Sequence, residues 1–168
     1  GLNELLIKAR ANPDARAGKQ ELQTYIDTHP PNRWTATAQK ESAAADERIA
    51  KQDYETTMQK AGDSGENYES VTPILQNYLN TAPPEPFCGL AKERLNRIPA
   101  MIDDRDFRRI SEKFPDSTTD LEGLQKAMED YLKAHPRGAH REASKKVLAK
   151  LPDTIDEREF RKIKDKLD

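Results

Sequence analysis

Residues 131–138 read YLKAHPRG, and two earlier stretches match them: YLNTAPPE at 78–85 and YIDTHPPN at 25–32. The tyrosine, the aliphatic residue after it and the proline recur at an interval of 53 residues, because 131 − 78 and 78 − 25 both equal 53. A fixed internal period of this size is typical of helical arrays built from one supersecondary unit. The sequence therefore predicts a repeat protein.

The period runs through the chain without a gap. Aligned apolar positions include Leu22, Leu75 and Met128, then Ile49, Ile102 and Ile155, and then Tyr54, Phe107 and Phe160. We predict three copies, at about residues 13–62, 66–115 and 119–168, with residues 1–11 forming the tail of a preceding long helix. Since both ends of the sequence fall inside the pattern, we expect it to be a fragment of a larger protein.

Each copy is predicted to begin with a short amphipathic helix, because its apolar residues recur at helical spacing. This stripe consists of Leu121, Leu124, Met128, Tyr131 and Leu132 in the third copy, and of Tyr68, Val71, Leu75, Tyr78 and Leu79 in the second. Thr119 with Glu122 suggests a capping box, and Asn12-Pro13 suggests the N-cap and first turn in the first copy. The prolines at 30, 83 and 136 are expected to end these helices, since proline disfavours a helical residue before it.

A longer helical segment follows, over about 34–61, 87–114 and 140–167. Its apolar stripe changes face at mid-helix, between Ile102 and Phe107 in the second copy. Pro99 and Pro152 lie near this change, so we predict one long helix that is kinked in copies two and three. Two abutting helices, each with proline in its first turn, are the alternative.

The rotated stripe lets a long helix pack on the short helix before it and, further along, on the short helix after it. The predicted fold is therefore all-α, an elongated array of alternating short and long antiparallel helices with no β-sheet. The composition agrees, since 35% of the residues are charged, 35% are hydrophobic and only 6% are aromatic. A low apolar share suits helices that each keep a solvated face.

The motif Tyr131-Leu132-x-x-His135-Pro136-x-Gly138-x-His140 resembles the signature of tandem bacterial tetratricopeptide-like helical repeats. Trp34, Phe87 and His140 match the second aromatic position of that signature, and Ala38, Ala91 and Ser144 match its small position. Copies one and two lack the glycine. The shared long helices are also similar to those of spectrin-like three-helix repeats. These resemblances imply scaffolding or protein binding, and they bring no catalytic residue.

The histidines and the lone cysteine are interpreted as structural. His29 and His135 precede the turn prolines at a phase where the second copy has alanine, which favours helix-end packing or capping over ligation. His140-Arg141-Glu142 lacks the spacing that places two zinc ligands on one helix face. Cys88 has no histidine nearby in sequence, so an inert, buried or half-buried thiol is expected.

The acidic run Asp103-Asp104-Arg105-Asp106 recurs as Asp156-Glu157-Arg158-Glu159. Carboxylates at this spacing could ligate a hard cation. Arginine inside each run favours a solvated helical face with i,i+4 pairing instead. Gly138, which is peculiar to the third copy, is interpreted as a residue that tightens the turn.

The tyrosines at 25, 78 and 131 lie on the apolar stripe, so a core position is predicted rather than a stacking platform for nucleic acid. The net charge of −2, with dispersed Lys and Arg, also argues against nucleic-acid binding. No apolar run reaches the length of a membrane span, so direct membrane insertion is not expected.

The predicted function is a non-catalytic helical-repeat scaffold or protein-interaction module, without catalytic, metal-binding or cofactor-binding residues and without a cofactor. Its expected partners are another protein or neighbouring domains of the same chain. The alternatives are an accessory ligand-binding or regulatory region of an enzyme such as a protein kinase, and a mechanical or oligomerising spacer.

Overall fold

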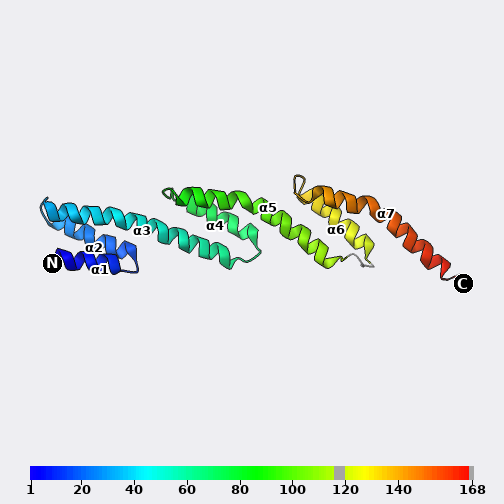
Figure 1. The fold of residues 1–168 in the computed structure, drawn as a ribbon, viewed down its shortest axis with the longest axis horizontal. Coiled ribbons are helices and arrows are strands. Elements are labelled where there is room, and N and C mark those ends of the chain that lie inside the picture. Colours follow the sequence, from blue (N-terminus) through cyan, green and yellow to red (C-terminus); the bar gives the residue numbers. More distant parts are fainter. Residues whose placement is uncertain (116–119, 167–168) are drawn as a thin grey trace. The chain divides into compact units, whose positions relative to one another are not determined.

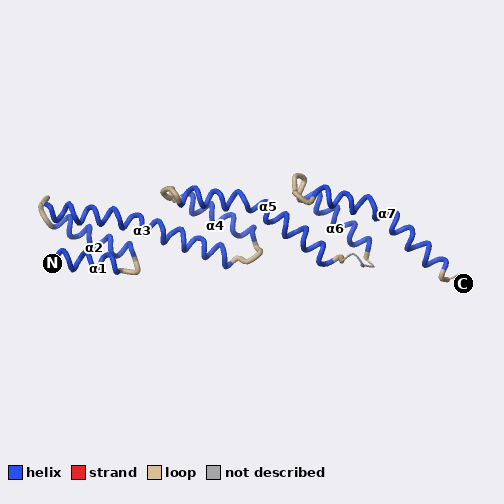
Figure 2. Tube along the Cα trace, viewed as in Figure 1, coloured by secondary structure: helices blue, strands red, loops and turns tan. Residues whose placement is uncertain are grey.

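The chain is helical throughout the part that the computed structural model describes, residues 1–115 and 120–166 (Figures 1 and 2). No strand occurs in these residues, which confirms the predicted all-α class. In chain order the helices are α1 (Leu2–Ala11), α2 (Ala15–Thr28), α3 (Arg33–Asp63), α4 (Tyr68–Asn80), α5 (Phe87–Lys113), α6 (Leu121–Ala134) and α7 (Arg141–Lys164). That the three sequence copies form one alternating array stays a prediction.

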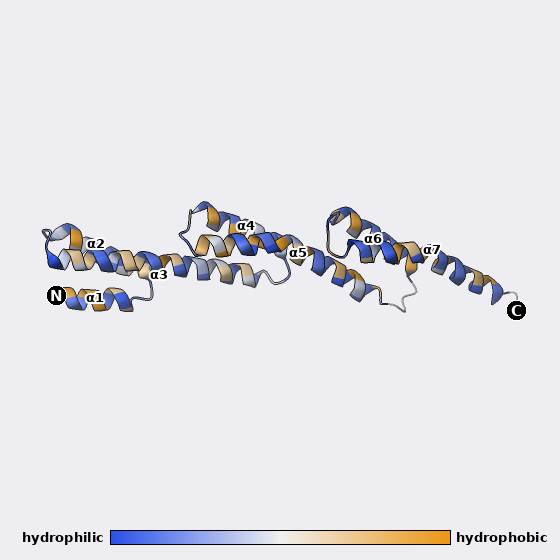
Figure 3. Cartoon of the chain, turned by 45° about the horizontal axis from the view of Figure 1, so that its top comes forward, coloured by the Kyte–Doolittle hydropathy of each residue, from blue (hydrophilic) through white to orange (hydrophobic). Residues whose placement is uncertain are grey.

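The long helices are continuous through their prolines. Pro99 lies inside α5 and Pro152 lies inside α7, and neither helix is interrupted there. The alternative of two abutting helices is therefore wrong. Figure 3 shows why the helices need neighbours: hydrophobic and hydrophilic residues alternate along them, so each has an apolar side to bury.

Two predicted helix starts are placed differently in the structure. The N-cap of α2 is Asp14, whose carboxylate accepts from the backbone N–H groups of Arg16 and Ala17. Asn12 instead ends α1, and its side chain accepts from the N–H of Asp14 at 3.0 Å. The predicted Thr119 cap lies outside the described residues, and α6 is capped by Asp120.

The chain divides into two compact units, Gly1–Leu95 and Asn96–Asp168, and the boundary falls inside α5. In the first unit, α1, α2 and the first part of α3 enclose a small core formed by Leu6, Ala9, Leu22 and Ala38. Small residues bring α1 close to α2. A Cβ at Gly18 would lie 2.6 Å from the backbone oxygen of Ala9.

A buried carboxylate also stabilises the first unit. The Glu41 side chain on α3 is 9% exposed and accepts from Arg10 at 2.7 Å and from Arg48 at 3.1 Å. The hydrogen bond from Arg10 lowers the pKa of Glu41 in spite of its burial. This ion pair ties α1 to α3.

In the second unit, α6 and α7 form a hairpin that packs through Met128, Tyr131, Ser144 and Leu151. The short turn between them, residues 135–140, begins after α6 ends at Ala134. This end lies two residues before Pro136, so the helix stops at the proline as the sequence predicted. This turn lies against the second half of α5, where the candidate site is formed.

Candidate functional site

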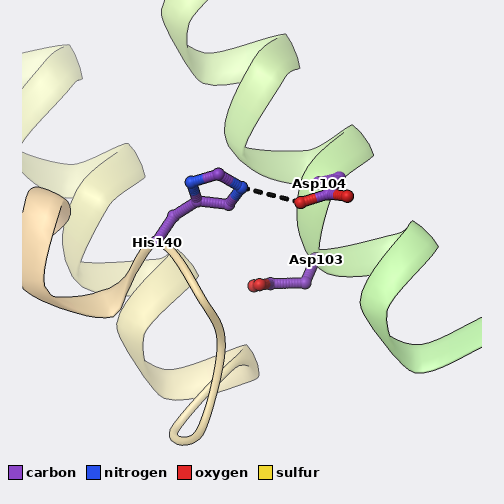
Figure 4. Close-up of side chains that lie close together, drawn as sticks. All are labelled: Asp103, Asp104 and His140. Carbon is purple, nitrogen blue, oxygen red and sulfur yellow. Dashed lines mark hydrogen bonds and ion pairs between the residues drawn. The ribbon is translucent and has the colours of Figure 1, made fainter.

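The candidate site is a joint between α5 and the turn of the α6–α7 hairpin. On α5 it uses residues 103–107, Asp-Asp-Arg-Asp-Phe, which we call the acidic–aromatic segment of α5. On the hairpin it uses the YLKAHPRGAH motif at 131–140. Figure 4 shows the two parts facing each other, with His140 directed at Asp104 and the Asp103 carboxylate directed at the turn.

Asp103 lies at the centre of this joint. It is 4% exposed, and its carboxylate accepts from the Tyr131 hydroxyl and, at 2.6 Å, from the backbone N–H of Ala139. A buried carboxylate is stable only when hydrogen bonds replace the water it has lost. The two donors come from the end of α6 and from the turn, so this single side chain fixes α5 to both.

The absence of a side chain at Gly138 leaves space for the Asp103 carboxylate. A Cβ built at this position would lie 2.2 Å from Asp103 Oδ1 and 2.8 Å from its Cγ. Gly138 has no left-handed φ. It lies in a tight turn, where its N–H donates to the His135 carbonyl at 3.1 Å and its own carbonyl accepts from the Arg141 N–H at 3.3 Å. The predicted tightening of the turn stays a prediction, and the structure adds a steric reason for the glycine. The side chain of any other residue would displace the carboxylate from its donors.

Two histidine–carboxylate contacts flank the buried bond. His135 Nε2 lies 3.0 Å from Asp106 Oδ2, and His140 Nε2 lies 2.7 Å from Asp104 Oδ1. The His135 side chain is 12% exposed, whereas Asp104 is 68% exposed. The His135 pair is thus the better shielded of the two, and the His140 pair is at the surface, where such pairs contribute little.

Aromatic contacts complete the joint around Phe107. Its ring stacks on His140 at a centroid distance of 4.3 Å and an interplanar angle of 7°. It meets the Tyr131 ring edge-on at 5.7 Å and 60°. Aromatic pairs of these two geometries are favourable beyond the area they bury.

The environment of Tyr131 raises the pKa of its phenol well above the ordinary value. Burial of the hydroxyl is the largest cause, and the hydrogen bond to Asp103 and the negative charge of that carboxylate add to it. The joint therefore holds Tyr131 neutral, as a donor, across the physiological pH range.

Three of these residues also have the chemistry of a metal site. Asp103, Asp104 and His140 place one potential ligand atom each within 4.8 Å of one another. Carboxylate oxygen and imidazole nitrogen are common ligands of divalent ions. Here the donors are engaged with protein groups: His140 with Asp104, and both Asp103 oxygens with the hairpin. The sequence analysis assigned no metal ligand, and the geometry assigns these atoms to the helix–hairpin joint.

The first unit contains a second joint, between α3 and the turn after α4, that lacks the carboxylate. Ala50 stands at the phase of Asp103, and Tyr78 stands at that of Tyr131. The rings are arranged similarly, since Tyr54 meets Tyr78 at 6.1 Å and 59°. Tyr78 is 6% exposed, and within the described residues its hydroxyl has no hydrogen-bond partner.

The turn of this second joint differs where the missing carboxylate would lie. Glu85 replaces Gly138, and Pro86, which has no N–H to donate, replaces Ala139. A cavity of about 300 Å³ lies at this joint, and Ala50, Tyr78 and Ala82 line part of it. In the first unit, Ala50 on the long helix thus faces a turn with Glu85 and Pro86. In the second unit, Asp103 faces a turn with Gly138 and the N–H of Ala139.

Several sequence interpretations are settled by this geometry. Tyr78 and Tyr131 are core residues, as predicted. The solvated-face interpretation of the acidic run is wrong for Asp103 and for Arg105, which is 6% exposed and pairs with Asp106. It holds for Asp104, which is exposed.

The histidines and the cysteine follow their structural interpretation with one addition. His29 and His135 both end their helices and contact the tyrosine four residues before them, with His29 stacked on Tyr25 and His135 tilted against Tyr131. His135 also contacts Asp106, a role that its replacement by alanine in the second copy did not suggest. Cys88 is half-buried.

The close contact between Asp103 and Gly138 was not predicted from the sequence, although both residues lie in motifs that were recognised there. The signal that could have identified them is their exchange between copies, since the Asp and Gly of one joint are Ala and Glu in the other.

None of the described helices combines the length and the apolar character needed to cross a membrane. No protein-family model, no curated protein and no solved structure matches the chain.

Proposed function

We propose that the chain is a non-catalytic helical-repeat module that binds a protein partner or holds neighbouring domains in place. Its three sequence copies would then be equivalent units of one array, in which short and long helices alternate. The observation that carries this proposal is the joint around Asp103. Its tyrosine and histidines, which are side chains well suited to catalysis, each pair with one carboxylate of α5 and so connect that helix to the hairpin.

The occupied hydrogen-bond acceptors of the joint support this role. A catalytic or ligand-binding carboxylate needs an accessible oxygen, whereas both oxygens of Asp103 already accept from the hairpin. The acidic–aromatic segment of α5 recurs on α7 as residues 156–160, whereas α3 has Ala50 at the phase of Asp103. Two of the three copies therefore carry the same connector, as is expected of a helical-repeat array.

A second candidate, an accessory region that binds a small ligand, is favoured by the first unit. A cavity of about 540 Å³ there is lined partly by Arg16, Asp53, Lys60 and Tyr78. It offers the charged groups of Arg16, Asp53 and Lys60, and the Tyr78 side chain forms part of its wall. Pockets with a few convergent polar groups are typical of small-molecule sites.

Thermal unfolding in the presence of a panel of metabolites and divalent cations separates the two candidates. Binding to the folded state raises Tm by mass action, so an interaction module should show no shift with any compound of the panel. Cross-linking with mass spectrometry in an extract of the source cells should then identify a protein held at defined lysines of the chain. A metabolite that raises Tm, with the increase lost in Lys60→Ala, would favour the ligand-binding candidate instead.

A further inference from the structure

The second half of α7 carries an acidic–aromatic segment that the described residues leave uncovered. Residues 156–160 read Asp-Glu-Arg-Glu-Phe and match Asp-Asp-Arg-Asp-Phe at 103–107, one period of 53 earlier. The environments of the two segments differ. Asp103 is buried and Phe107 half-buried, whereas Asp156 is exposed and Phe160 is 68% exposed. Ile163, one turn beyond Phe160, is 58% exposed.

We infer that the acidic–aromatic segment of α7 binds a helix–turn–helix hairpin of a protein partner whose turn reads Tyr-x-x-x-His-Pro-x-Gly. This inference rests on the proposed function as an interaction module and names the class of partner. The matching segment of α5 is covered by such a hairpin within this chain, which supplies the template for each contact.

The contact between α5 and the α6–α7 hairpin indicates which partner group each residue of the α7 segment would bind. The partner tyrosine and the N–H after its glycine donate to Asp156, as Tyr131 and Ala139 donate to Asp103. The partner histidine pairs with Glu159, and an aromatic or imidazole ring at the second aromatic position of the partner stacks on Phe160. Hydrogen bonding favours this arrangement, because carboxylates on α7 accept from imidazole N–H groups of the turn. Glu159 now pairs with Lys162 at 3.1 Å and with Arg158 at 3.2 Å. Its side chain is 52% exposed, so docking displaces these surface pairs at little cost.

The aspartate also determines which hairpins fit. A side chain at the glycine position would lie 2.2 Å from the carboxylate, and proline at the next position would remove a donor. The hairpin of the second copy has Glu85 and Pro86 there, and it meets Ala50 rather than an aspartate. Asp156 therefore selects hairpins whose turn has glycine followed by a residue with a free N–H, which we call the glycine type. It rejects hairpins with glutamate and proline at these two positions, which we call the glutamate–proline type.

The hairpins of a second copy of the chain fit this segment less well. The α6–α7 hairpin is already engaged by α5 through Tyr131. The α2–α3 hairpin has Asn32 at the glycine position, and that side chain caps α3 by accepting from Trp34 and Thr35. Its flank is also covered by α1, whose Leu6 is buried. A separate partner with a glycine-type turn is thus the better occupant.

Two fusions of equal length test the inference on the full chain. After Asp168 we would append either residues 116–151, with the glycine-type hairpin, or residues 63–98, with the glutamate–proline type; both continue the period in phase. Amide hydrogen exchange of residues 152–166, read by mass spectrometry, reports docking, because covered helical amides exchange more slowly. The glycine-type fusion should slow this exchange by about tenfold or more, and the other fusion should leave it unchanged.

Asp156→Ala is the matched variant. It should abolish the protection in the glycine-type fusion and leave the exchange of the unfused chain unchanged. Equal protection by both fusions, no protection by either, or protection that survives Asp156→Ala would each overturn the inference. So would self-association of the unfused chain in light scattering if Phe160→Ser abolished it, because a second copy would then occupy the segment. None of these outcomes decides whether the chain is an interaction module, which the ligand panel tests separately.

Discussion

The coupling between Asp103 and Tyr131 can be measured by a double-mutant cycle. Asp103→Ala removes two hydrogen bonds to a charged group and leaves a buried hydroxyl without its acceptor. Hydrogen bonds to charged groups contribute about 1.5–3 kcal/mol each, and an unsatisfied buried group costs about 1–3 kcal/mol. The carboxylate regains hydration in the unfolded state, which offsets part of this sum. We expect a net loss of about 2–4 kcal/mol in the unfolding free energy of the second unit.

Tyr131→Phe removes one donor but keeps the ring against Phe107, so it should cost about 1–2 kcal/mol. If the hydroxyl and the carboxylate interact as the structure shows, the double variant should lose less than the sum of the single losses. The difference, the coupling energy, should be about 1.5–3 kcal/mol.

Urea unfolding followed by circular dichroism gives these free energies, and hydrogen exchange assigns them to residues 120–166. Trp34, the only tryptophan, lies in the first unit, and the transition seen by its fluorescence should not change. Asp104→Ala is the matched control, since its exposed pair with His140 should contribute less than about 1 kcal/mol. A coupling energy below about 0.5 kcal/mol would refute the reasoning, because the buried bond would then contribute no more than a surface pair.

Three further predictions concern packing and pH. Gly138→Ala should destabilise the second unit by about 1–3 kcal/mol through overpacking, and Asp103→Ala should suppress most of that loss; a full loss in the double variant would contradict the close approach. Gly18→Ala should cost about 1–3 kcal/mol in the first unit, because the new methyl group meets the backbone oxygen of Ala9, which cannot move aside as a side chain does. The folded state raises the pKa of Tyr131, so the stability it contributes is present below the unfolded tyrosine pKa of about 10 and is lost as the pH rises above it. Unfolding at alkaline pH should show this loss, and Tyr131→Phe should reduce the pH dependence.

Much of the fold could be predicted because the period of 53 residues aligns helix ends, prolines and apolar stripes. Tyr78 and Tyr131 are buried for the reason that the stripe suggested. The candidate site was harder to predict because its key interaction is non-local. Asp103 resembles a surface residue when it is read beside Asp104 and Arg105, and only the turn 36 residues later, where Ala139 donates to it, buries it. Local charge pairing was therefore a poor guide to burial.

Gly138 shows the same limit. A glycine in a turn suggests backbone freedom, whereas here it is needed because a side chain from another helix takes up the space. This role of Gly138 becomes visible when the copies are compared for the positions at which they differ, rather than for the residues that they share. The positions that differ together between copies are those that touch across the joint.

The central claim, that the turn residues determine which joint forms, is tested most directly by introducing the aspartate, the glycine and the N–H donor of the second unit's joint into the joint of the first unit. Ala50→Asp should stabilise the chain only when Glu85→Gly and Pro86→Ala supply the space and the N–H, because Tyr78 then has its acceptor and the carboxylate has two donors. We predict that the unfolding free energy measured with Trp34 fluorescence rises by about 1–2 kcal/mol in that background and falls when Ala50→Asp is introduced alone. The same effect of Ala50→Asp in both backgrounds would contradict the claim that the turn residues determine which joint forms.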